Sequence, residues 1–170
     1  ADMVTSGVAP GIIMMQLLET SQAHSFSNSI VDYLPYLGLL LTLAACYRLA
    51  NFNIDTRQSD SFIGIPTPAM ALFVISLPLI GLHSDISFFT ELTNNNYFLI
   101  AVTLLLSYLM NAELPLFALK FKSFGFKENT MKYLFLLTSV VLLVLLQFVA
   151  IPLIIILYVV ISIVANVKKA

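Results

Sequence analysis

The 170-residue chain is 59% apolar, carries only 10% charged residues and has a formal net charge of −1. Soluble domains carry about 25% charged residues because they need a solvated surface, so this composition excludes an ordinary soluble globule. The sequence has no basic stripe with interleaved aromatic residues, which excludes nucleic-acid binding. The single cysteine, Cys46, excludes an intramolecular disulfide and lies in an apolar run.

Apolar blocks of membrane-spanning length recur along the whole chain. A bilayer core needs about 20 mostly apolar residues per helix. The predicted spans are residues 3–18, 30–47, 65–82 and 97–119, followed by a block over 132–167 that is too long for one span. Gln147 and Pro152 interrupt that block and divide it into two helices joined by a tight turn. The sequence therefore predicts an all-α, polytopic transmembrane helix bundle with about six spans, forming a single membrane domain over residues 1–170.

The positive charges all fall on one face of a six-span bundle. The eight lysine and arginine residues follow the second and fourth spans or lie at the C-terminus, whereas the connections 19–29 and 83–96 carry none. By the positive-inside rule, the basic loops, the C-terminus and Asp2 face the cytoplasm. Chemistry on a polar cytosolic substrate is therefore expected near the loops 49–64 and 120–131.

A polar face marks the start of the first span. Helical spacing places Asp2, Thr5, Ser6 and Ala9 together on this small face. An ionisable side chain near a membrane helix is costly unless it faces a cavity or a partner. Two interpretations stay open at this point: Asp2 belongs to a functional site, or it sits in the headgroup region.

Two further candidates follow the second span. Arg48 and Asn51 are three residues apart on one helix face, where a guanidinium either binds a phosphate or snorkels as an anchor. In the next loop, Gly64 permits close approach of the backbone to a ligand, and Pro66 and Pro68 fix the entry into a helix. The alternative interpretation of this loop is a stiff junction before the third span.

Taken together and in this order, these three segments resemble the phosphatidylserine synthase branch of the CDP-alcohol phosphatidyltransferases. The stretch ADMVTSGVAP at 1–10 is similar to the tail of the family's aspartate motif, with Ser6 where phenylalanine is common. RLANFN at 48–53 is similar to R-L-A-R-F-N, with Asn51 replacing the second arginine. FIGIPTPA at 62–69 is similar to F-x-G-L-P-x-P-A. Beyond residue 120 the resemblance rests on hydropathy alone.

The resemblance implies an enzyme that transfers the phosphatidyl group from CDP-diacylglycerol to L-serine, giving phosphatidylserine and CMP. It implies that Asp2 is the last aspartate of the motif and serves as a ligand of Mg²⁺ or Mn²⁺, or as the base for the serine hydroxyl. Arg48 is then expected to contact a phosphate or the serine carboxylate. Substrate contacts are expected from the polar and loop residues of the other two segments, namely Arg48, Asn51, Asn53, Gly64, Pro66 and Pro68.

The earlier part of the motif, D-G-x-x-A-R and the preceding aspartate, is absent from this chain. We therefore expect the sequence to be the C-terminal part of a longer protein of the bacterial cytoplasmic membrane, and to be inactive alone. The alternatives are a family member with another acceptor, such as glycerol phosphate or inositol, and a small transporter subunit. A transporter would show polar residues at mid-membrane depth, whereas here they cluster at the predicted cytoplasmic ends. A homodimer stays open.

Overall fold

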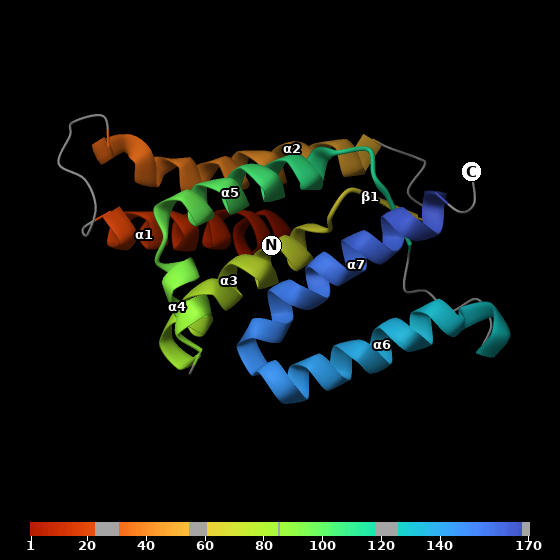
Figure 1. Ribbon diagram of the computed structural model, residues 1–170. Coiled ribbons are helices and arrows are strands. Elements are labelled where there is room, and N and C mark those ends of the chain that lie inside the picture. The colour runs from red at the N-terminus through yellow and green to blue at the C-terminus, as the bar shows by residue number, and fades with distance from the viewer. Residues whose placement is uncertain (23–30, 55–60, 85, 118–125, 168–170) are drawn as a thin grey trace.

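The computed structural model describes residues 1–22, 31–54, 61–84, 86–117 and 126–167. These ranges are helical apart from connecting turns and two strands of three residues each, which confirms the all-α class (Figure 1). In chain order, the elements are η1 (Val4–Val8), α1 (Ala9–Gln22), η2 (Val31–Gly38), α2 (Leu39–Ile54), β1 (Ser61–Ile63), α3 (Thr67–His83), α4 (Ser87–Thr93), α5 (Asn96–Asn111), β2 (Pro115–Phe117), α6 (Phe126–Leu146), η4 (Gln147–Val149) and α7 (Ala150–Val167).

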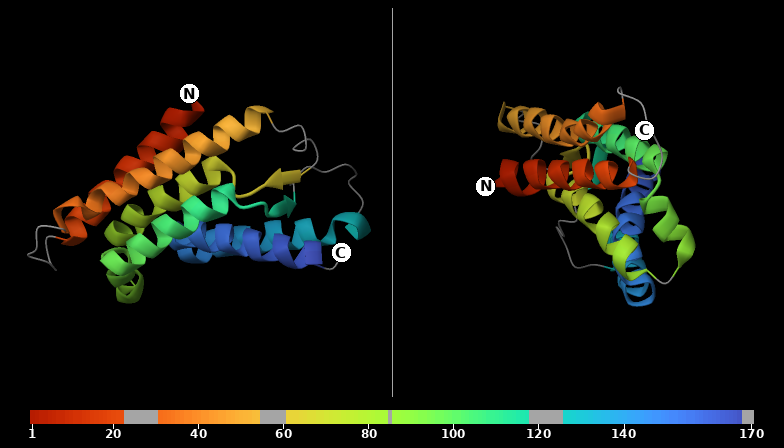
Figure 2. Two further views of the ribbon diagram at one scale, coloured as in Figure 1. Left: turned by 90° about the horizontal axis from the view of Figure 1, so that it is seen from above. Right: turned by 90° about the vertical axis from the view of Figure 1, so that its left-hand side faces the viewer.

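The long helices lie side by side, and consecutive ones run in opposite directions (Figures 1 and 2). The core lies between α1, α2, α3 and α5, and α7 contributes Ile155 and Val159 to it. Helix α6 packs against α7 at the edge of the bundle. The end of the bundle that carries β1, β2 and the C-terminal ends of α2 and α5 is here called the strand end. It is well seen in Figure 2.

Helix α6 presents a wide apolar face outward. Leu137, Val144 and Leu145 are 64%, 75% and 72% exposed. Such a surface is unfavourable in water and favourable against lipid. Two helical stretches are long and apolar enough to cross a membrane by length and composition, namely Tyr33–Asn53 and Thr130–Val164, the second of which comprises most of α6 and α7 with η4 between them. Helices α3 and α5 are apolar but shorter. The count of six spans therefore stays a prediction.

The predicted division of the last apolar block is confirmed. Helix α6 ends at Leu146, Gln147 adopts a φ of 46°, and α7 begins at Ala150, so that α6 and α7 form an antiparallel hairpin (Figure 1). Pro152 lies in the first turn of α7, where a missing N–H removes no helical hydrogen bond.

The boundaries of two other predicted elements are corrected. The helix expected over 97–119 ends at Asn111, because Pro115 lacks an N–H and disfavours helical geometry in the residue before it. The chain instead forms β2 from Pro115. The connection 83–96, expected to be a loop, contains the short helix α4.

Small residues bring α1 and α2 unusually close. Thr42 Oγ1 donates a hydrogen bond to the Gly7 carbonyl at 3.0 Å. A Cβ on Gly38 would lie 2.4 Å from the backbone nitrogen of Met15. Gly7 and Gly11, four residues apart, form the type of small-residue spacing that lets membrane helices approach closely. This contact fixes the position of the N-terminal segment along α2.

Replacing Gly38 by alanine is expected to lower stability by about 1–3 kcal/mol, because the new methyl group collides with backbone rather than with a movable side chain. The measurement is the thermal midpoint of the purified protein in detergent. Gly81→Ala is the matched control, since a Cβ there would meet only the Thr93 hydroxyl, at 3.3 Å. An unchanged midpoint for Gly38→Ala would contradict the close contact of α1 with η2.

Candidate functional site

The loop before α3 is attached to the C-terminal end of α5. Strands β1 and β2 pair in antiparallel register, with Phe62 opposite Leu116. Two backbone bonds extend the attachment: Gly64 N–H donates to the Leu114 carbonyl at 2.9 Å, and Ile65 N–H donates to the Leu109 carbonyl at 3.0 Å. The segment that resembles F-x-G-L-P-x-P-A is therefore held against α5 at the strand end.

Gly64 is required here for two physical reasons. Its φ is +69°, a region that side chains with a Cβ rarely adopt. A Cβ at this position would also lie 2.4 Å from the Met110 carbonyl oxygen. The close approach that Gly64 permits in this structure is thus to α5. Its predicted part in an acceptor pocket stays a prediction.

Arg48 lies at the centre of this arrangement and is only 8% exposed. Its Nη1 donates to the Ile63 carbonyl at 2.7 Å and to the Met110 carbonyl at 3.0 Å. Met110 is in the last turn of α5, where the helix dipole favours a cation. The side chain is therefore no snorkelling anchor, because it joins α2, β1 and α5.

These bonds constrain how Arg48 can meet a substrate. Each terminal guanidinium nitrogen carries two N–H groups, and both of those on Nη1 are directed at backbone carbonyls. A contact with a phosphate or carboxylate would fall to Nη2 or Nε. Sequence reasoning missed the structural bonds, because their acceptors are backbone carbonyls 15 and 62 residues away.

The other predicted residues lie around Arg48 or close to it along the chain. Asn51 is half-buried and Asn53 is exposed in the last turn of α2. Pro66 caps the N-terminus of α3, and Pro68 is exposed in its first turn, as expected of a proline at a helix start. Asn111, at the predicted cytoplasmic end of the fourth span, donates through Nδ2 to the Ala44 carbonyl at 3.2 Å and so ties α5 to α2.

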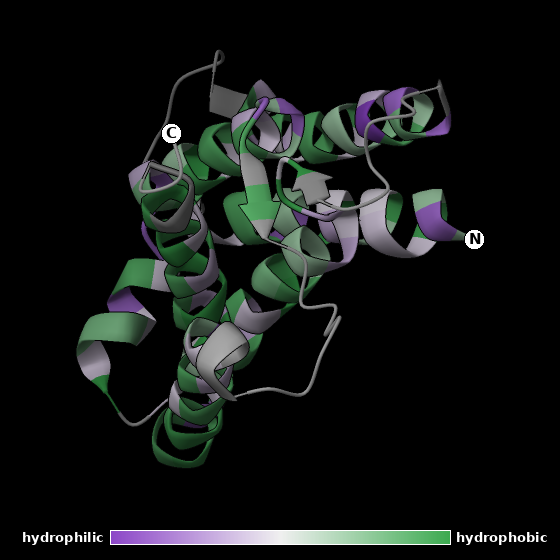
Figure 3. Ribbon diagram, turned by 90° about the vertical axis from the view of Figure 1, so that its right-hand side faces the viewer, coloured by the Kyte–Doolittle hydropathy of each residue, from purple (hydrophilic) through white to green (hydrophobic). Residues whose placement is uncertain are grey.

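Asp2 is exposed at the start of the N-terminal helix, and its Oδ1 accepts a hydrogen bond from Ser6 Oγ at 3.3 Å. The helix continues as the π-helix η1, in which the Ala9 N–H donates to the Val4 carbonyl. π-Helical turns are rare in proteins, and those that occur are frequently found at functional sites. Figure 3 looks onto the strand end and shows hydrophilic residues close to the N-terminus.

Asp2 and Arg48 lie towards the same end of the bundle. A Cβ on Gly7 would meet the Ala45 side chain at 3.2 Å, and α1 and α2 are antiparallel (Figure 2). Asp2 is five residues before Gly7 and Arg48 three residues after Ala45. At a rise of about 1.5 Å per residue, they lie roughly 7 and 5 Å beyond that contact, both in the direction of the strand end.

The described residues by themselves do not fit a divalent metal. No group of three or more His, Cys, Asp or Glu side chains within the described ranges is close enough to hold one ion. A hard cation such as Mg²⁺ or Ca²⁺ takes six or more oxygen ligands, and Asp2 supplies one carboxylate. The predicted metal therefore enters no step derived from this structure.

Comparison with known proteins gives one consistent result. No family model matches the chain, and neither does any solved structure. The chain is 38% identical over 77 residues to the CDP-diacylglycerol–serine O-phosphatidyltransferase of Helicobacter pylori strain J99, covering 44% of this chain and 29% of that protein. It is 36% identical over 83 residues to the protein of the same name from Bacillus subtilis, covering 45% of this chain and 40% of that protein. A second Helicobacter pylori strain, 26695, has a relative that is 36% identical over 77 residues.

The matched region thus spans well under half the length of these relatives. All three carry the same name, which agrees with the resemblance found in the three sequence segments. The recognition made from the sequence is confirmed: the chain is related to the phosphatidylserine synthases of the CDP-alcohol phosphatidyltransferase type.

Proposed function

We propose that this chain belongs to an integral-membrane phosphatidyltransferase that moves the phosphatidyl group of CDP-diacylglycerol to L-serine. The observation that carries the proposal is the identity of 36–38% to three proteins named for this reaction. In the reaction, the serine hydroxyl oxygen forms a bond to the phosphorus of the phosphatidyl group. The phosphorus–oxygen bond to CMP breaks, the hydroxyl proton passes to a base, and phosphatidylserine stays in the membrane.

The strand end is the proposed place of this chemistry. Asp2 is proposed as the base for the serine hydroxyl, or as a ligand of the metal, and its exposure keeps the carboxylate accessible. Arg48 is proposed to contact a phosphate or the serine carboxylate through Nη2 or Nε, with Asn51 and Asn53 nearby on the same helix. Because Arg48 Nη1 is bonded to the Ile63 carbonyl, such a contact would lie beside the loop that contains Gly64.

The orientation proposed for the chain follows from its basic loops. Six spans would place the strand end and the C-terminus in the cytoplasm, and the connection that contains α4 outside. Asn94 is exposed in that connection. In a full-length protein without other cysteines, which includes Cys46→Ser, an Asn94→Cys variant in intact cells should react with a membrane-impermeant maleimide. Protection of this cysteine until the cells are opened would reverse the orientation.

The acceptor and the metal are tested together with the full-length protein in membranes. Release of CMP from CDP-diacylglycerol is measured with serine, glycerol phosphate or inositol, and with Mg²⁺, Mn²⁺ or a chelator. We expect release to require serine, to stop on chelation and to return when either metal is added. Release driven by another alcohol would keep the reaction type and overturn serine as the acceptor. Undiminished release of CMP in excess chelator would overturn the proposed requirement for a metal ion.

A further inference from the structure

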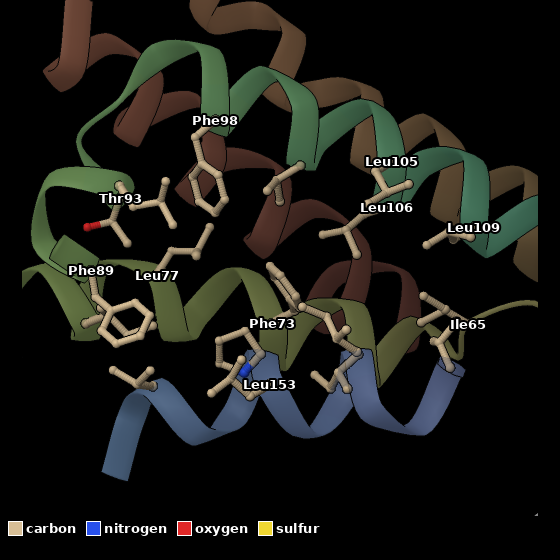
Figure 4. A pocket seen from close by; sticks show the side chains of 18 of the residues that line it. Ile65, Phe73, Leu77, Phe89, Thr93, Phe98, Leu105, Leu106, Leu109 and Leu153 are labelled. Atoms are coloured by element: carbon tan, nitrogen blue, oxygen red, sulfur yellow. The ribbon is translucent and has the colours of Figure 1, made fainter. Parts of the chain in front are cut away.

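A cavity of about 330 Å³ lies between α3, α4, α5 and α7 (Figure 4). Its walls are formed by hydrocarbon side chains, including Phe73, Leu77, Phe98, Leu106 and Leu153. Thr93 is the exception, and its hydroxyl donates to the Thr90 carbonyl at 3.0 Å. Such a cavity offers neither water nor a polar ligand the partners it needs, so its occupant is expected to be a hydrocarbon.

The dimensions of the cavity fit one lipid chain. Its lining runs from Phe98 to Leu109 on α5, and from Val149 at the end of η4 to Val160 on α7. Each stretch is about 16 Å long at the helical rise of ~1.5 Å per residue. The volume is roughly twice the ~150 Å³ that accommodates benzene, which corresponds to about a dozen carbon atoms.

The two ends of the cavity differ. At the strand end it reaches Ile65, which follows Gly64 and whose N–H is bonded to the Leu109 carbonyl. At the other end it reaches α4, which contributes Phe89, Leu92 and Thr93 (Figure 4). A chain whose headgroup lies at the strand end would therefore point its methyl end at α4.

We propose that this cavity binds one acyl chain of the lipid donor, CDP-diacylglycerol, and that α4 closes its far end and thereby sets the chain length. The identity of the lipid rests on the proposed function, whereas the chemistry of the chain rests on the cavity. Leu105 on α5 and Val160 on α7 border the cavity and are 55% and 50% exposed. The cavity is therefore open to the surrounding lipid on this side.

The physical basis of this selection is exclusion rather than attraction. Lipid tails are as apolar as the leucine side chains that line the cavity, so a chain gains little affinity by leaving the bilayer for it. A chain longer than the cavity, however, meets the side chains of α4 and cannot seat its headgroup at the strand end. The length of the acyl chain therefore determines whether the headgroup can reach its position at the strand end.

Binding is tested without reference to activity. The full-length protein in lipid nanodiscs receives CDP-diacylglycerol with a photoreactive group near the end of one acyl chain, or phosphatidylethanolamine with the same chain. We expect the cytidine lipid to cross-link to peptides of α4, α5 and α7, with at least several-fold less labelling by the other lipid. Equal labelling by both lipids, or labelling confined to the exposed face of α6, would overturn the proposal.

Selection is tested by shortening the cavity. Val102 is 7% exposed and lies on its wall, so Val102→Phe should shift the preferred acyl length of CDP-diacylglycerol towards shorter chains, by about tenfold in relative use. Leu104→Phe is the control, because Leu104 is 50% exposed on the same helix and does not line the cavity. An unchanged chain-length profile in an active Val102→Phe protein would overturn the cavity proposal alone. Specific cross-linking without any serine transfer would instead overturn the proposed function and leave the cavity as a lipid site.

Discussion

Asp2→Asn is expected to reduce serine transfer at least about 100-fold, the range that loss of a general acid–base group produces. The substitution keeps the size of the side chain and its bond to Ser6, and removes the charge that either proposed role requires. Because Asp2 is exposed and its described contact is within its own helix, the amount of folded protein should not change.

The control for this prediction uses the same chemical change at the other end of the same helix. Glu19 is exposed near the end of α1, and Glu19→Gln should transfer serine at the wild-type rate. Rates are measured with labelled serine in membranes that contain equal amounts of each variant. An Asp2→Asn protein with full activity would remove Asp2 from the site.

Arg48→Ala should cost about 2–6 kcal/mol of stability, because the buried Met110 carbonyl and the part-buried Ile63 carbonyl lose their donor at ~1–3 kcal/mol each. The acceptors belong to β1 and to the last turn of α5, so the loop before α3 would also lose one of its attachments. The thermal midpoint and the yield of monodisperse protein in detergent measure this effect. Arg48→Lys should recover part of it, since an ammonium keeps the charge and loses the planar donor geometry.

The outcome separates the two roles that Arg48 can have. Asn53→Ala, an exposed position in the last turn of the same helix, is the control and should leave the thermal midpoint unchanged. An Arg48→Ala protein that has the thermal midpoint of the wild type but fails to transfer serine would show that the substrate contact matters and the structural bonds do not. Loss of the folded protein would show the reverse order of importance.

Sequence reasoning succeeded where side chains alone determine the structure. The break between α6 and α7 was predicted because a glutamine and a proline interrupt an apolar block, and the structure places the break at Gln147. The entry into α3 was predicted from Pro66 and Pro68, because prolines are favoured at the start of a helix. The grouping of Arg48 with the loop around Gly64 was expected only from the family resemblance, and hydrogen bonds join them in the structure.

Features that depend on backbone groups or on distant elements could not be predicted in this way. Every residue carries a carbonyl, so no pattern of side chains identifies those of Ile63 and Met110 as partners of Arg48. The π-helical turn at Val4–Val8 has no residue signature either. Helix α4 had a weak one, since Phe88, Phe89 and Leu92 have helical spacing, yet the polar residues around them suggested a loop.

The strand end is proposed to belong to an enzyme that makes phosphatidylserine. The most direct measurement is the formation of labelled phosphatidylserine from labelled serine and CDP-diacylglycerol by the full-length protein, in membranes from cells without such an activity of their own. We expect a labelled lipid whose formation requires CDP-diacylglycerol and is lost in Asp2→Asn. The absence of any labelled lipid from well-folded protein, with serine and with every other alcohol tested, would contradict it and favour a membrane protein of another class, such as a transporter subunit.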